Sequence, residues 1–275
     1  MQHLITYFST ACFLLLFNSC KKEQFNINNL NGDKISVFGH GGMGIGQSYP
    51  MNSLESILNC LYLGADGTEI DVQMTKDGVL VAFHDETLEE STNLKGRIYD
   101  KNWSEIKEAR YKYPMFSNYK IIKLETLFKL IPHQDQYSYF LDCKNFEPNK
   151  DSSYISRFNN SLIKIIDQYN LQSSTYVEFK NEALIAALKD IRPDIKQFIY
   201  SYYHEAFSLA EKYNLEGLTI EITNLTHKRI QELHNAGIMV ATFNTHSHKR
   251  NIEAVKYNVD FIQTDRVKHL IKILK

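Results

Sequence analysis

The stretch Gly64–Asp85, GADGTEIDVQMTKDGVLVAFHD, decides the fold of this 275-residue chain. Two runs within it, 68–74 and 79–84, are rich in apolar residues and have the length of β-strands. Only Thr75-Lys76-Asp77-Gly78 separates them, whereas parallel neighbours need a crossover of about a dozen residues or more. The stretch therefore predicts a hairpin, in which 79–84 is an antiparallel excursion from strand 68–74.

Around this hairpin, short apolar runs alternate with longer amphipathic segments. The short runs predict further strands over 35–40, 137–144, 174–179, 195–200, 217–222, 238–244 and 260–264. The amphipathic segments predict helices over 53–63, 103–110, 124–131, 152–169, 181–190, 204–213, 226–236, 249–257 and 266–274. Eight strands remain without the excursion, most of them separated by helices. This order predicts an α/β protein, a (β/α)8 TIM barrel over residues 34–275, with an open doubly wound sheet as the alternative.

Two local features refine this prediction. Residues 85–123 have little periodic pattern and are expected to form a lid or small insertion after the second barrel strand. Asn52, with Glu55 three residues later, predicts the N-cap and capping box of helix 53–63, and Gly64 marks the end of that helix.

The composition excludes several classes of protein. Lys and Arg number 31 and Asp and Glu number 32, so the formal net charge is −1. This balance gives no electrostatic reason to expect a nucleic-acid partner. Apolar residues make up 43 % of the chain and charged residues 23 %, which is typical of a folded globular protein rather than a disordered one.

The N-terminal residues predict an export signal. Residues 4–17 are apolar but shorter than the roughly 20 residues of a membrane span, so we interpret 1–19 as a signal peptide. Ser19-Cys20, at the switch to a polar segment, resembles a bacterial lipobox. We expect a lipid on Cys20, a tether over 20–33, and attachment to a bacterial cell-envelope membrane. A plain secretory signal with an incidental cysteine is the alternative.

Polar residues stand at the predicted strand ends, where catalytic groups collect in (β/α)8 barrels. Glu69 and Asp71 are two residues apart on one strand and therefore point to the same face. Asp142 and Lys144 repeat this spacing on the next barrel strand. His40 and His84 end two further strands.

This set of side chains predicts a metal-assisted site. Neighbouring carboxylates inside a barrel repel one another unless a cation joins them. With Asp142 as the third carboxylate, Glu69 and Asp71 offer oxygen ligands for Ca²⁺ or Mg²⁺. The two histidines suit general acid–base roles, and Lys144 suits a phosphate oxygen. The alternative is an internal ion-pair network of Glu69, Asp71 and Lys144.

The same residues resemble the motifs of the glycerophosphodiester phosphodiesterase family. The family motif H-R-G corresponds to His40-Gly41-Gly42, and G-A-D-x-I-E-x-D-V-x-x-T-K-D-G corresponds to 64–78. The later family motifs, which include E-x-K and W-T-V-N, correspond in order to His84-Asp85, Asp142-Cys143-Lys144, Ala241-Thr242-Phe243-Asn244 and Thr264-Asp265. The resemblance extends over about residues 35–270.

The resemblance implies the role of each site residue. His40 and His84 would be the acid–base pair, and Lys144 would contact the phosphate. One divalent cation, Ca²⁺ or Mg²⁺, would be held by Glu69, Asp71 and Asp142. The implied reaction is hydrolysis of a small-molecule glycerophosphodiester to glycerol 3-phosphate and an alcohol.

Three departures from the family pattern concern the substrate. Gly41 replaces the Arg that follows the first histidine, so a bidentate phosphate clamp is missing. Backbone N–H groups of the loop that contains Gly41 and Gly42 are candidates to meet an anion instead. Asp142 replaces Glu and is one methylene shorter. We assign the place of the family Trp to Phe243, which keeps an apolar wall.

Three functions are consistent with this sequence. The first is hydrolysis of glycerophosphodiesters. The second is a phospholipase-like phosphodiesterase that cleaves lyso- or intact lipids. The third is a non-catalytic lipoprotein that binds phosphoryl ligands, motivated by Gly41. Other candidates for the mouth of the barrel are His246, His248, Glu178 and Glu221, whereas His204, His227 and His234 are expected at the surface or at helix caps.

Overall fold

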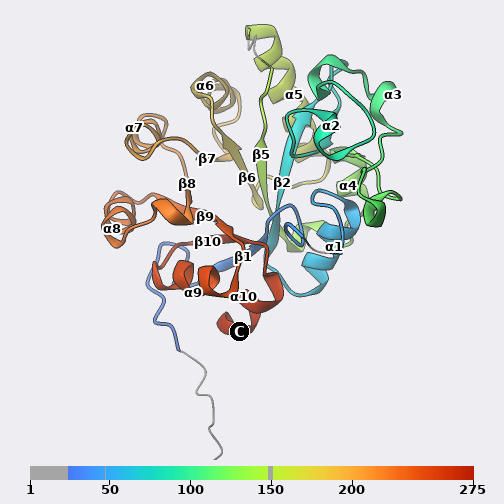
Figure 1. The fold of residues 1–275 in the computed structure, drawn as a ribbon. Coiled ribbons are helices and arrows are strands. Elements are labelled where there is room, and N and C mark those ends of the chain that lie inside the picture. Colours follow the sequence, from blue (N-terminus) through green and yellow to red (C-terminus); the bar gives the residue numbers. More distant parts are fainter. Residues whose placement is uncertain (1–23, 47, 148–150) are drawn as a thin grey trace, which may run out of the picture.

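The computed structural model describes residues 24–46, 48–147 and 151–275. Within them, eight parallel strands close into a barrel (Figure 1). The strands are β1 (Ser36–Gly39), β2 (Gly67–Met74), β5 (Ser138–Cys143), β6 (Thr175–Phe179), β7 (Lys196–Ile199), β8 (Gly217–Glu221), β9 (Met239–Thr245) and β10 (Phe261–Thr264). Pairing of β1 with both β10 and β2 closes the barrel. The predicted (β/α)8 architecture is confirmed, and the open sheet is excluded.

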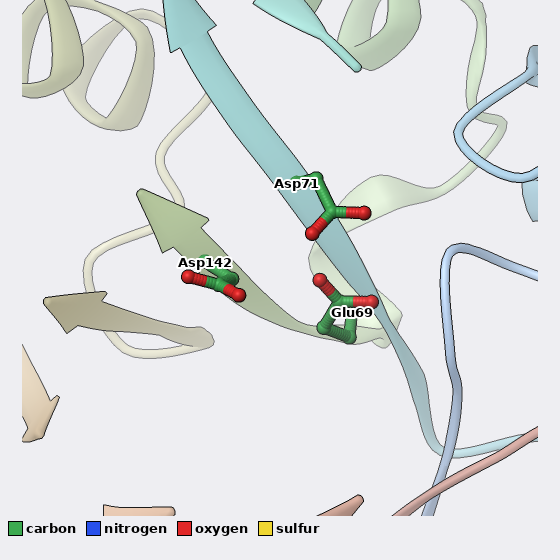
Figure 2. A group of neighbouring side chains, drawn as sticks. All are labelled: Glu69, Asp71 and Asp142. Carbon is green, nitrogen blue, oxygen red and sulfur yellow. The ribbon is translucent and has the colours of Figure 1, made fainter. Parts of the chain in front are cut away.

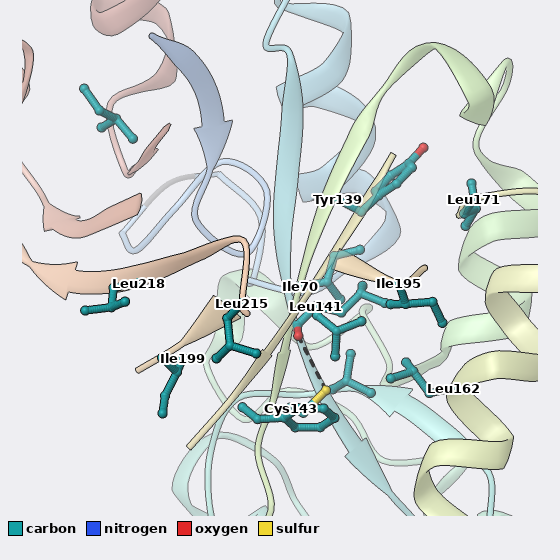
Figure 3. Close-up of a cluster of buried hydrophobic side chains, with 14 of the residues drawn as sticks. Ile70, Tyr139, Leu141, Cys143, Leu162, Leu171, Ile195, Ile199, Leu215 and Leu218 are labelled. Carbon is teal, nitrogen blue, oxygen red and sulfur yellow. Dashed lines mark hydrogen bonds between the residues drawn. The ribbon is translucent and has the colours of Figure 1, made fainter. Parts of the chain in front are cut away.

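Helices follow the barrel strands and surround them (Figure 1). They are α1 (Leu54–Tyr62), α4 (Leu124–Leu130), α5 (Ser152–Gln168), α6 (Glu182–Ile191), α7 (Tyr203–Tyr213), α8 (His227–Asn235), α9 (His248–Lys256) and α10 (Val267–Leu274). Residues on the outward faces of the strands, such as Ile70 and Leu141, pack against them with complete burial (Figure 3).

The segment after β2 leaves the barrel as predicted. β3 (Leu80–Ala82) pairs antiparallel with β2, and Thr75 N–H donates to Val79 O at 2.9 Å to close the turn. A strand not predicted, β4 (Ile122–Lys123), pairs with β3. The insertion between them contains α2 (Leu88–Ser91), α3 (Trp103–Ile106) and a small core of its own around Phe83.

The prediction of a helix over 103–110 is wrong in its second half. Helix α3 ends at Ile106, and the chain then turns into short antiparallel bridges. Arg110 bridges to Lys120, and Tyr111 bridges to Thr92. These bridges satisfy backbone groups that a longer helix would otherwise bond internally.

The prediction of Asn52 as the N-cap of α1 is also wrong. Ser53 is the cap, and its side chain accepts a hydrogen bond from Ser56 N–H. Asn52 has a left-handed backbone conformation, with φ of 63°, which directs its side chain into the barrel instead. Gly64 follows the helix with φ of 92°, as expected of a residue just past a C-cap.

Two layers of side chains fill the inside of the barrel. The lower layer is a buried cluster of rings with one alanine, namely Phe38, Phe140, Tyr176, Phe198, Ala241 and Phe261. Since strand side chains alternate between faces, the residues two positions later lie one layer higher, and they are His40, Asp142, Glu178, Tyr200, Phe243 and Gln263. The rings form a floor beneath the polar groups.

The predicted signal peptide and the lipidation candidate Cys20 lie outside the described residues. The described part of the predicted tether packs against the barrel. Asn29 Nδ2 donates to Val259 O at 2.9 Å, Asn31 N–H donates to Asp260 Oδ1 at 3.0 Å, and Phe25 and Ile27 pack on the core. None of the helices in the described part of the chain has the length and hydrophobicity of a membrane span.

Candidate active site

Three buried carboxylates converge at the C-terminal end of the barrel. Glu69 and Asp71 come from β2 and Asp142 from β5, and one oxygen of each lies within 4.8 Å of the others. Figure 2 shows the three side chains directed to one space. The parallel register pairs Asp71 with Asp142 across the two strands, which explains why the sequence spacing predicted their proximity.

Neighbouring groups fix two of these carboxylates. Asn52 Nδ2 donates to Asp71 Oδ2 at 2.6 Å, and its Oδ1 accepts from Asp71 N–H at 2.9 Å. Gly41 N–H donates to Glu69 Oε2 at 2.7 Å. The loop after β1 and the turn before α1 therefore orient the acids of β2.

Lys144 lies between two of the acids. Its Nζ is 3.0 Å from Asp71 Oδ1 and donates to Asp142 Oδ2. Part of the ion-pair network considered from the sequence therefore exists, although Glu69 bonds to the Gly41 backbone rather than to Lys144. One ammonium group faces three carboxylates.

The electrostatics show that positive charge is scarce in this cluster. Burial raises the pKa of Glu69 well above its ordinary value, and Asp71 and Asp142 raise it further. Burial alone would also raise the pKa of Asp71, but Lys144, His84 and His40 hold it well below its usual range. Among the described residues, Asp142 Oδ1 is buried without a hydrogen-bond partner. A hard divalent cation fits such a set of oxygens.

An aspartate joins His40 to a third histidine. Asp265 Oδ1 is 2.9 Å from His40 Nδ1, and Asp265 Oδ2 bonds to His246 Nδ1. Burial alone would raise the pKa of Asp265, but the two imidazoles lower it. With Nδ1 bonded to this carboxylate, Nε2 of His40 is left for a substrate.

His84 also has an aspartate partner. Its Nδ1 lies 2.9 Å from Asp85 Oδ1. This hydrogen bond and the charge of Asp71 raise the pKa of His84 above its ordinary value. His40 and His84 both lower the pKa of Asp71, so both imidazoles lie near the acid cluster.

The positions after β1 require glycine for steric as well as functional reasons. Gly41 has φ of 54°, and a Cβ there would lie 2.7 Å from Met51 Cε. A Cβ on Gly42, with φ of 91°, would lie 2.5 Å from the backbone of Ser56 in α1. Met51 therefore occupies space beside the position of the missing family Arg.

The aromatic position on β9 differs from our assignment. Laid letter by letter on W-T-V-N, the segment 241–244 puts Ala241, not Phe243, at the Trp position. Ala241 belongs to the lower layer, and Phe243 lies one layer nearer the mouth, in edge-to-face contact with Tyr200 at 5.1 Å between ring centroids. An aromatic wall is present, but two residues further along the strand.

The comparisons with known proteins agree with this architecture. A family model described as the glycerophosphoryl diester phosphodiesterase family matches residues 43–269. The chain belongs to the glycerophosphoryl diester phosphodiesterase family. A glycerophosphodiester phosphodiesterase of Caldanaerobacter subterraneus subsp. tengcongensis is 29 % identical over 252 residues, which cover 88 % of this chain and 98 % of the relative. One from Bacillus altitudinis is 24 % identical, with 86 % and 97 % covered.

Solved structures of phosphodiesterases share the fold. A phosphodiesterase of Oleispira antarctica, in complex with the product sn-glycerol-3-phosphate, superposes with a TM-score of 0.75 at 20 % identity, covering 86 % of this chain and 96 % of its own. A glycerophosphoryl diester phosphodiesterase of Parabacteroides distasonis gives 0.69 at 23 % identity, covering 90 % and 92 %.

The structure brings the predicted catalytic and metal-ligating residues to one end of the barrel. Two participants were not predicted as site residues, namely Asn52 and Asp265, whereas His246 was a candidate for the mouth of the barrel. Asp265 stands in the quoted motif Thr264-Asp265, so the signal for it was present. Asn52 was hidden by its resemblance to a helix cap. Glu178 is buried facing the interior, and Thr219 Oγ1 donates to it.

Proposed function

We propose that this chain is a phosphoric diester hydrolase that converts glycerophosphodiesters to glycerol 3-phosphate and an alcohol. The observation that carries the proposal is the buried trio Glu69, Asp71 and Asp142, with one ammonium group beside it and two histidines nearby. Membership in the phosphodiesterase family and the product complex of the Oleispira antarctica relative support the same reaction.

The position of each side chain suggests its role in the reaction. A divalent cation held by the trio would neutralise the phosphate and the charge that develops on it in the transition state. Lys144 would contact a non-bridging phosphate oxygen. Asp265 and Asp85 bond to the Nδ1 atoms of His40 and His84, so the Nε2 atoms would be the ones to meet the reacting groups. One of these imidazoles would deprotonate the attacking group, and the other would protonate the leaving alkoxide.

The test is release of glycerol 3-phosphate from glycerophosphocholine and glycerophosphoethanolamine by residues 21–275. Each substrate is assayed with Ca²⁺, with Mg²⁺ and with chelator, beside Asp71→Asn. Cation-dependent release that disappears in the variant supports the proposal. Turnover that is unchanged by chelator and by Asp71→Asn would contradict it.

A binding-only function is the competing proposal, because Gly41 removes the phosphate clamp. Multiple turnovers by the wild-type chain, abolished in His40→Ala, would exclude it. Phosphorus NMR of the products separates simple hydrolysis from a route that yields a cyclic phosphate.

We further propose that the chain is exported and anchored by a lipid on Cys20. The support is the sequence alone, where Cys20 follows an apolar segment and Ser19. Expression of the full chain in a bacterial host, followed by fractionation and mass spectrometry, tests this. Wild type is expected in the membrane fraction and Cys20→Ser in the soluble one. Equal fractionation of both would contradict lipidation.

A further inference from the structure

A polar hollow of about 560 Å³ opens at the mouth of the barrel, beside the C-terminal ends of the neighbouring strands β6, β7 and β8. Lys180 directly follows β6, Tyr200 directly follows β7, and Glu221 is the last residue of β8. Arg229, in the first turn of α8, also lines it. The described lining of the hollow therefore contains two cations and one carboxylate.

The hollow adjoins the proposed catalytic groups. Lys180 also lines a smaller hollow of about 200 Å³ together with Lys144, which is the proposed contact of the phosphate. The Tyr200 ring lies edge to face with Phe243 of the upper barrel layer, with 5.1 Å between the ring centroids. A substrate whose phosphate lies at Lys144 can therefore reach Lys180 with one of its two alcohol groups.

Both cations are held in place by groups that do not neutralise them. Lys180 Nζ lies 4.3 Å from the centroid of the Tyr200 ring, and Arg229 Cζ lies 4.6 Å from that of the Tyr203 ring. Arg229 Nη1 also donates to Asn224 O at 2.6 Å. Neither cation forms an ion pair with another residue of the described part of the chain. Rings and a carbonyl fix these charges in position but leave them available to a ligand.

The other large hollow of the mouth has the opposite charge. It has a volume of about 590 Å³, lies beside His84, and has Asp85 and Glu90 but no lysine or arginine in its described lining. A negative group on a substrate would therefore be repelled there and attracted to the hollow beside β6, β7 and β8.

The chemistry of a glycerophosphodiester indicates which part would use the two cations. The phosphate has Lys144 and the divalent cation of the acid trio, and the glycerol group is uncharged. The remaining part is the headgroup alcohol, and available cations favour one with a negative group. Glu221 in the same hollow disfavours a second negative charge and favours an ammonium group beside the first.

We propose that Lys180 and Arg229 select a headgroup alcohol that carries a carboxylate beside an ammonium group, as serine does. The carboxylate would bond to the two cations, and the ammonium group would face Glu221. This inference rests on the proposed phosphodiesterase function and names the class of alcohol that the reaction releases. Lys180 and Arg229 would act on the choice of substrate and not on the bond that breaks.

The experiment compares two esters that differ by one carboxylate. Release of glycerol 3-phosphate is measured from glycerophosphoserine and from glycerophosphoethanolamine near neutral pH, with Ca²⁺ or Mg²⁺ present. A hydrogen bond between charged groups contributes about a tenfold gain in affinity at the lower end of its range, which suits cations near the surface. We expect kcat/KM to be at least about tenfold higher for the serine ester.

A set of variants shows where the preference arises. Lys180→Gln and Arg229→Gln are each expected to lower the serine-to-ethanolamine ratio of kcat/KM about threefold, and the double variant is expected to bring it to about one. Lys228→Gln is the matched control, because it removes a positive charge from the same helix α8. Its side chain is 85 % exposed and does not belong to the described lining of the hollow. This control is expected to keep the wild-type ratio.

Several results would overturn the inference. One is a kcat/KM for the ethanolamine ester that equals or exceeds that for the serine ester in the wild type. Another is a serine preference that survives the double variant. An equal loss for both esters in Lys180→Gln would assign this cation to the phosphate or the glycerol group.

If neither ester is turned over, the proposed function fails, and titration calorimetry with Ca²⁺ present decides the inference separately. Binding of glycerophosphoserine at least about tenfold tighter than glycerophosphoethanolamine, with the difference lost in the double variant, supports the inference. Equal or undetectable binding of the two esters rejects it.

Discussion

The two layers inside the barrel are separated by one repeat of the strand pleat and differ in almost every other respect. In the lower layer, the rings of Phe38 and Phe198 each contact the Phe140 ring edge to face, with centroid distances of 5.1 and 4.9 Å. In the upper layer, Asp142 and Glu178 stand two residues beyond Phe140 and Tyr176 and are buried acids with few positive charges near them. The comparison shows that the same strands supply stability at one level and reactivity at the next.

The largest expected effect is on catalysis in the upper layer. Asp142→Asn removes a ligand charge from the trio while keeping its shape. We expect kcat/KM for glycerophosphocholine to fall by about 10³-fold or more, as when a principal stabiliser of transition-state charge is lost. Steady-state kinetics with saturating Ca²⁺ or Mg²⁺ measures this. The thermal midpoint in chelator is expected to stay at or above that of the wild type, since the variant relieves repulsion with Glu69 and Glu178.

A matched change in the lower layer is expected to affect stability instead. Phe140→Ala leaves a cavity in the ring cluster and should reduce the free energy of unfolding by about 3–5 kcal/mol. Denaturant unfolding measures the loss. The folded fraction should keep a divalent-cation affinity within a few fold of wild type. A selective loss of cation binding would show that the layers are not independent.

The Asn52 side chain links the cluster to the turn before α1, and its loss should have an intermediate effect. Asn52→Ala removes the hydrogen bond to Asp71 Oδ2, and partners of ligating carboxylates typically contribute about 10- to 100-fold to metal affinity or activity. We expect cation affinity, measured by titration calorimetry, to fall by this factor. Asn59→Ala, on the exposed side of α1, is the control and should leave the affinity unchanged.

The smallest effect concerns the pH dependence of stability. Burial and the charge of Asp142 raise the pKa of Glu178 to about 8, so the folded state keeps a proton that the unfolded state loses near pH 4.5. Stability without a cation should therefore decline as the pH rises from about 4.5 to about 8. Glu178→Gln, which resembles the protonated acid, should flatten this decline. Thermal midpoints across this range in chelator measure it, and an unchanged slope would contradict the assignment.

The sequence was most informative where periodicity and chemistry coincide. The i, i+2 spacing of Glu69 with Asp71 and of Asp142 with Lys144 placed their side chains inside the barrel, because a strand allows only two faces. The hairpin at 75–78 followed from its length alone. These are local constraints, which a single sequence expresses directly.

What could not be predicted depends on contacts between distant segments. The sequence around Asn52 predicts a helix cap. In the folded chain, however, the Asn52 side chain bonds to Asp71, nineteen residues later. The bonding of Asp265 to both His40 and His246 requires the barrel to close between its first and last strands. The insertion lacks periodicity because its small core is assembled from bridges and short turns rather than from long elements.

The docked segment before β1 has a consequence for how the enzyme would sit on a cell. Asn29 and Asn31 hold this segment beside the residues that lead into β10, which is the end of the barrel opposite the mouth. Phe25 is five Cα–Cα steps from Cys20, a reach of roughly 18 Å when fully extended. A lipid on Cys20 would therefore keep the barrel floor close to its own bilayer and turn the mouth outward. Substrates would arrive as single molecules from the surrounding fluid rather than by lateral diffusion from the membrane below.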